Sequence, residues 1–282
     1  MRTRLLLGPL LLGGVLALFL ADALWWPEVR PCVSLLIAAI GVFSWIEFQL
    51  LAGMGPRGPR HDRALYCAGV AGVLYFHGAA WWIGARHTSV AHSGAVVAGV
   101  YAVLLALLAL VVLRREFLKQ YRNLLETLLG VLLFGWLLSY LLRIYHLPAG
   151  IPLGVAFLVG VKGTDIAAYL VGSRFGRRRF LSVSPKKTVE GCSGALIFGS
   201  VWFCGVSLVL ESAPFSWWQG AIFGIILGGV AQLGDLAESL IKREYQTKDS
   251  RALIPEFGGI LDMIDSLLLT GYLFWSALRS TL

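Results

Sequence analysis

Apolar residues fill nine long segments of this chain, and short polar stretches separate them. A helix of about 20 apolar residues is long enough to cross the hydrocarbon core of a bilayer. The segments are residues 5–26, 31–51, 64–83, 94–113, 124–142, 151–170, 190–210, 215–240 and 262–278. The pattern predicts an all-α polytopic membrane protein with about nine transmembrane helices.

The composition agrees with a membrane protein. Hydrophobic residues make up 57% of the chain, charged residues 14%, and the mean hydropathy is +0.75. A soluble domain carries about a quarter charged residues. The net charge of +8 does not indicate a nucleic-acid partner, because basic loops beside anionic lipid headgroups explain it.

The basic residues lie mostly on one side of the predicted helices. Alternate connections carry most of the 24 lysines and arginines, whereas the opposite connections hold Arg30, Arg86, Arg143 and Arg279. The positive-inside rule therefore places the N-terminus in the cytoplasm. The apolar run at residues 5–26 could belong to a signal peptide, but it is long enough to span, and we interpret it as a retained first helix.

A first polar cluster lies inside the sixth segment. Lys162, Asp165 and Tyr169 are spaced three and four residues apart, which places them on one helix face. Charges at membrane depth are expensive unless they are paired, hydrated or functional. The cluster is therefore either a structural ion pair or part of a site.

A second cluster precedes the seventh segment. Ser184 is predicted to cap a helix, with Pro185 at its first position and Lys186 and Lys187 in its first turn. Both lysines and the helix N-terminus would then converge on a phosphate. A basic loop facing lipid is the alternative, and it suffices for the arginines at 177–179.

A third cluster ends the eighth segment. Asp235, Glu238 and Ser239 share a helix face, and Lys242 follows Glu238 by four residues. A solvated ion pair with Lys242 would explain Glu238. Asp235 lies too deep in the segment for a plain surface role.

The fourth cluster opens the last segment. Asp262 and Asp265 lie one turn apart, directly after the pair Gly258 and Gly259. One acid could simply stabilise the helix N-terminus. Two acids on one face, beside glycines that let backbone approach a ligand, fit a metal–phosphate site better.

Two polar stretches together resemble the signature of the phosphatidate cytidylyltransferase (CDP-diacylglycerol synthase) family, over residues 160–270. The downstream matches are Ser239, Lys242, Arg243, Lys248, Asp249, Pro255, Gly258, Gly259, Asp262 and Asp265. The upstream matches are Asp165, Ala168, Tyr169, Gly172, Phe175, Gly176 and residues 184–191. Two positions depart from the family pattern: Phe257 stands where a His is usual, and Met263 where an Arg is usual.

The resemblance implies transfer of a cytidylyl group from CTP to phosphatidic acid. It implies catalytic roles for Asp235, Asp249, Asp262, Asp265, Lys242 and Lys248. It implies substrate binding by Asp165, Tyr169, Ser184, Lys186, Lys187, Thr188, Glu190, Ser239, Arg243, Gly258 and Gly259. It also implies Mg²⁺ as the cofactor, with Asp235, Asp262 and Asp265 as ligands and room for a second cation.

The expected organisation follows from these assignments. Residues 1–150 would form a transmembrane scaffold that allows homodimer contacts, and residues 151–282 a catalytic region whose site faces the cytoplasm. The expected location is a bacterial inner membrane, with membrane lipids as further partners. Two other functions remain open: a CTP-dependent polyprenol or lipid kinase, and an ion or solute transporter.

Overall fold

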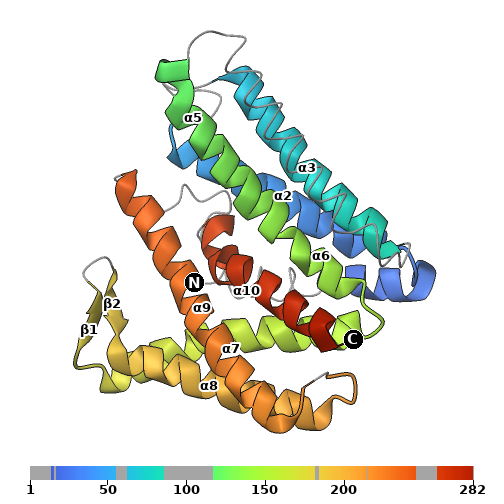
Figure 1. Ribbon diagram of the computed structural model, residues 1–282, viewed down its shortest axis with the longest axis vertical. Coiled ribbons are helices and arrows are strands. Elements are labelled where there is room, and N and C mark those ends of the chain that lie inside the picture. The colour runs from blue at the N-terminus through green and yellow to red at the C-terminus, as the bar shows by residue number, and fades with distance from the viewer. Residues whose placement is uncertain are drawn as a thin grey trace. The chain divides into compact units, whose positions relative to one another are not determined.

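A computed structural model describes residues 14–15, 17–54, 62–85, 117–181, 184–213, 215–245 and 259–281 (Figure 1). The described part is helical apart from one hairpin. Its elements are α2 (Pro31–Leu51), α3 (Arg63–Ala85), α5 (Phe117–Gly130), the π-helix η1 (Val131–Leu137), α6 (Ser139–Tyr145), α7 (Gly150–Phe175), β1 (Arg179–Leu181), β2 (Ser184–Thr188), α8 (Val189–Val209), α9 (Trp217–Glu244) and α10 (Ile260–Thr281).

Seven stretches of the described residues are long and apolar enough to cross a membrane. They are Pro31–Leu51, Arg63–Ala85, Tyr121–Tyr145, Gly150–Phe175, Val189–Val209, Trp217–Glu244 and Ile260–Arg279. The chain is therefore an integral membrane protein. The predicted segment at 94–113 lies outside the described residues, as do residues 5–13 and 16 of the one at 5–26, in which residues 17–25 are helical. The total of nine spans and the cytoplasmic N-terminus stay predictions.

The chain divides into two compact units. The first combines Met1–His146 with Asp249–Leu261, and the second combines Leu147–Lys248 with Asp262–Leu282. Each unit has its own buried core.

In the first unit, helices α2, α3 and η1 pack around aromatic side chains. Trp45 and Phe48 are fully buried. A Cβ atom at Gly69 would lie 2.1 Å from the Trp45 ring, so only glycine lets α3 approach that ring. The buried Asp22 carboxylate accepts hydrogen bonds from the N–H groups of Cys32 (2.8 Å) and Val33 (2.9 Å) at the start of α2. These bonds satisfy backbone donors that the first turn of a helix leaves free.

In the second unit, α8 packs against both α7 and α9 (Figure 1). The helices α8 and α9 touch backbone to backbone: a Cβ atom at Gly199 would meet the Gly224 carbonyl oxygen at 2.4 Å, and the converse distance is 2.1 Å. Small residues at such crossings are typical of membrane helices, which associate by close packing and not by a hydrophobic drive.

A two-stranded hairpin corrects two expectations from the sequence. Strands β1 and β2 pair antiparallel, with Arg179 opposite Thr188, so the described chain is not purely α-helical. The predicted helix start at Ser184 is wrong, because Ser184, Pro185, Lys186 and Lys187 lie in β2. Helix α8 begins at Val189, and its N-cap is Thr188, whose hydroxyl accepts a hydrogen bond from the Gly191 N–H at 3.1 Å. Strand pairing with β1 competes with the local helix signal here and prevails.

Candidate metal and phosphate site

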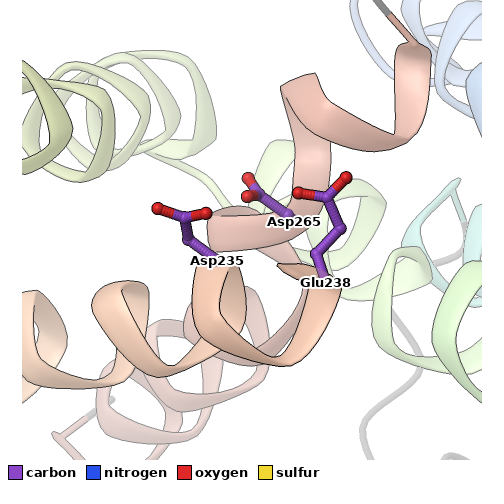
Figure 2. A group of neighbouring side chains, drawn as sticks. All are labelled: Asp235, Glu238 and Asp265. Atoms are coloured by element: carbon purple, nitrogen blue, oxygen red, sulfur yellow. The ribbon is translucent and has the colours of Figure 1, made fainter. Parts of the chain in front are cut away.

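Three carboxylates converge in the second unit. Asp235 and Glu238 lie one turn apart on α9, and Asp265 comes from α10 (Figure 2). One carboxylate oxygen from each residue lies within 4.8 Å of the others. Glu238 is 7% exposed and Asp265 is 8% exposed. Like charges this close and this buried repel strongly unless a cation lies among them.

A glycine brings α10 within reach of α9. A Cβ atom at Gly234 would lie 2.6 Å from the backbone oxygen of Asp265. Glycine at 234, directly before Asp235, therefore allows the two acid-bearing turns to meet.

The donor set fits a hard divalent cation. Three carboxylates offer oxygen ligands only, which Mg²⁺ and Ca²⁺ prefer, and no soft sulfur or imidazole donor belongs to the group. Asp235, Glu238 and Asp265 would hold such an ion, which fits the Mg²⁺ expected from the sequence.

Three lysines neutralise the cluster from different elements. The Lys187 ammonium lies 2.6 Å from Asp235 Oδ2 and donates to the Gln232 carbonyl oxygen at 3.3 Å. The Lys242 ammonium lies 2.6 Å from Glu238 Oε1 and also pairs with Asp262. The side chains of Lys187 and Lys242 are 15% and 13% exposed.

The third lysine, Lys162 of α7, lies 3.5 Å from Asp165 Oδ2 and 3.8 Å from Asp265 Oδ1. It donates a hydrogen bond to Ser266 Oγ at 2.8 Å. The sequence left open whether Lys162 and Asp165 form a structural pair or line a site. The contacts join them to the acidic cluster.

A pocket of about 230 Å³ that several polar side chains line opens beside the cluster. Its lining includes Asp165, Tyr169, Lys187, Thr188, Gln232 and Asp235. Two buried acceptors in this lining, Asp165 Oδ1 and Gln232 Oε1, have no hydrogen-bond partner among the described residues. Buried polar atoms are normally paired, so the pocket is built for a polar occupant.

The structure brings together six of the residues that the sequence singled out: Asp165, Lys187, Asp235, Lys242, Asp262 and Asp265. Tyr169 and Thr188 line the pocket beside them. The Asp262 carboxylate pairs with Lys242 and does not belong to the three-carboxylate group.

Other predicted site residues lie elsewhere. Glu190 accepts hydrogen bonds from the backbone N–H of Arg178 at 3.3 Å, which ties the hairpin to α8. Ser239 is half-buried on α9, Arg243 is exposed near the end of that helix, and Gly259 is buried before α10. Lys248, Asp249, Gly258 and the side chains of Ser184 and Lys186 lie outside the described residues.

Two residues of the site are not singled out by the sequence. A solvated ion pair explains Glu238 equally well there, and Gln232 carries no predicted role. A signal for both exists, because Gln232, Asp235, Glu238 and Lys242 follow one another at spacings of three, three and four along α9. This spacing places all four on one helix face.

Of the two positions that depart from the family pattern, Met263 and Phe257, the structure describes only Met263. Met263 is 44% exposed beside Asp262, so its side chain is not part of the acidic cluster. Phe257 lies outside the described residues.

Comparisons with known proteins agree with this chemistry. The model of the cytidylyltransferase family matches residues 2–281. A phosphatidate cytidylyltransferase from Synechocystis sp. is 40% identical over 137 residues, which cover 46% of this chain and 44% of that protein. The chloroplastic phosphatidate cytidylyltransferase 4 of Arabidopsis thaliana is 39% identical over 49% of this chain and 35% of its own length. A phosphatidate cytidylyltransferase from Bacillus subtilis is 34% identical over 60% of this chain and 62% of its own length. The chain thus covers less than two thirds of each relative.

Proposed function

The chain belongs to the cytidylyltransferase family, and on that premise we propose that it transfers the cytidylyl group of CTP to phosphatidic acid. The products are CDP-diacylglycerol and pyrophosphate. The names of the relatives support this reaction. The observation that carries the proposal is the group of Asp235, Glu238 and Asp265, set among lysines beside a pocket that polar side chains line, inside apolar helices.

The reaction replaces one phosphoanhydride bond by another. An oxygen of the phosphatidic acid phosphate attacks the α-phosphorus of CTP, a new P–O bond forms, and the bond between the α-phosphorus and the bridging oxygen breaks. The electron pair leaves with pyrophosphate. Because both reactants are anions, charge neutralisation and alignment are the main tasks of the protein. No general base is required, since the attacking phosphate is already ionised near neutral pH.

The lysines perform those tasks. Lys187 pairs with Asp235, and Lys242 pairs with Glu238 and Asp262. The carboxylates of Asp235, Glu238 and Asp265 would hold a divalent cation, which would supply positive charge at the phosphoryl oxygens. Lys187, which lines the pocket, would turn from Asp235 to donate a hydrogen bond to a phosphate of the substrate.

The setting supports a lipid substrate. The acidic group lies on helices that are long and apolar enough to span a bilayer. A site on such helices can receive a headgroup while the acyl chains stay in the membrane. We place the site at the cytoplasmic face of a bacterial inner membrane, where CTP is found and where the basic loops would lie. The homodimer expected from the sequence stays a prediction.

The test uses purified protein in lipid micelles with phosphatidic acid and CTP labelled at either the α- or the γ-phosphate. The proposal expects the α-label in the lipid product and the γ-label in pyrophosphate, only with Mg²⁺ present. An Asp235→Asn variant that is folded in detergent should lose this turnover. Transfer of the γ-label to lipid would show a kinase instead, and ion flux without CTP turnover would show a transporter.

A further inference from the structure

Lys162 places a cation in the middle of a membrane-spanning helix. It lies twelve residues after Gly150 and thirteen before Phe175, the two ends of α7. Its side chain is 38% exposed. Ionisable side chains at this depth are rare, and they face a partner or a functional site.

The ammonium of Lys162 donates one hydrogen bond and lies close to two carboxylates. Ser266 Oγ accepts at 2.8 Å, Asp165 Oδ2 lies at 3.5 Å and Asp265 Oδ1 at 3.8 Å. Ser266 Oγ in turn donates to Asp165 Oδ2 at 3.1 Å. The lysine thus joins the acid of α7 to the acidic turn of α10.

Lys162 changes the net charge of the site. Among the described residues, five carboxylates pair with three lysines there: Asp165, Asp235, Glu238, Asp262 and Asp265 with Lys162, Lys187 and Lys242. With all of them ionised, the group carries a charge of −2, which one divalent cation neutralises. Without Lys162 the charge would be −3, and one divalent cation would leave one negative charge without a neutralising partner.

We propose that Lys162 is a positioning residue that occupies the Asp165–Asp265 side of the acidic group. The group of Asp235, Glu238 and Asp265 then takes one divalent cation and no second one. The proposal deepens the proposed function and rests on it for the presence of a divalent cation. Lys162 does not touch the reacting atoms; it acts by holding Asp265 and by limiting the negative charge that attracts cations.

The experiment titrates the full chain in detergent with Mn²⁺, without nucleotide, and counts bound ions by electron paramagnetic resonance. The unaltered protein should bind one ion per chain at this site. Lys162→Met should bind a second ion, or bind the first about tenfold more tightly, because a like charge has been removed within a few ångströms. Lys162→Arg keeps the charge and should bind one ion with unchanged affinity.

Two further variants separate charge from folding. Arg174→Met removes one positive charge from the exposed last turn of the same helix and should leave Mn²⁺ binding unchanged. The double variant Lys162→Met/Asp165→Asn restores the charge of −2. It should fold even if Lys162→Met does not, and it should bind one ion. Two ions in the double variant, or Mn²⁺ binding to Lys162→Met identical to that of the unaltered protein, would overturn the proposal.

The readout does not depend on turnover. If Mn²⁺ stoichiometry follows these expectations while CTP and phosphatidic acid do not react, the proposed function fails and the role of Lys162 stands. If turnover occurs but the unaltered protein binds two ions at the acidic group, the role of Lys162 fails and the proposed function stands.

Discussion

The pair of Lys242 with Glu238 offers a sharp test of the site's electrostatics. The ammonium and carboxylate lie 2.6 Å apart, and their side chains are 13% and 8% exposed. Replacing Lys242 by Met leaves the Glu238 carboxyl group buried and without its lysine. Breaking a buried ion pair from one side costs about 3–5 kcal/mol of stability. We expect a loss of this size for Lys242→Met when divalent ions are removed by a chelator.

The loss should come from the stranded charge and not from lost packing. Glu238→Gln in the Lys242→Met background removes that charge, and Asp262, whose side chain is 35% exposed, can be hydrated. The double variant should therefore recover most of the stability, which gives a coupling energy of about 2–3 kcal/mol in the double-mutant cycle. Divalent cations should help as well: a ligand at a hundred times its dissociation constant stabilises the folded state by about 2.7 kcal/mol.

The assay is equilibrium unfolding in mixed micelles, followed by tryptophan fluorescence, with and without Mg²⁺. Arg243→Met is the matched control, since Arg243 is the exposed neighbour of Lys242, and its stability should change by no more than about 0.5 kcal/mol. Additive losses in the cycle, or a Lys242→Met variant as stable as the unaltered protein, would refute the reasoning.

Other variants test the lysine on β2, the helix crossing and the family departure. Lys187→Ala should lower kcat/KM for CTP about tenfold to a hundredfold, since a charge-assisted hydrogen bond contributes about 1.5–3 kcal/mol. Arg178→Ala removes an exposed charge and should lower kcat/KM less. Equal losses of kcat/KM in the two variants would contradict phosphate binding by Lys187. Gly234→Ala should cost about 1–3 kcal/mol of stability and weaken Mn²⁺ binding, because the new methyl group would meet the Asp265 backbone oxygen at 2.6 Å; unchanged binding would show that the crossing can adjust. Met263→Arg should leave steady-state turnover within about threefold, as a surface change does, because Met263 is 44% exposed; a manyfold gain would mark this chain as an impaired family member.

The helices were predictable because their signal is local. The apolar run at 31–51 coincides with α2, and six more predicted segments overlap helices of the structure. Apolar length alone decides whether a segment spans a bilayer, so no knowledge of its neighbours is needed. The π-helix η1 within the span Tyr121–Tyr145 has no such signal, since it depends on how that span packs.

The start of α8 was missed because two local signals compete. Ser184 followed by Pro185 is a good helix start by composition, yet Thr188 is a good N-cap as well. The choice between them depends on β1, which pairs with residues 184–188. Pairing between separate segments cannot be read from the preference of either segment alone. Here the pairing has a functional consequence, because it places Lys187 on a strand, beside Asp235, and not in a helix turn.

The same argument explains which part of the site could be anticipated. Helical spacing shows that Asp235 and Glu238 share a face of α9, and that Asp262 and Asp265 lie close together on α10. It cannot show which acid of α10 faces which acid of α9, because that depends on the rotation and height of two helices at their crossing. Gly234 permits the rotation and height observed here, because it allows α9 to contact the backbone of α10 at Asp265. Asp265 therefore joins Asp235 and Glu238, and Asp262, one turn away, meets Lys242. A site built on a helix crossing is thus predictable in its residue types, while the pairing of those residues follows from the glycine that lets the helices meet.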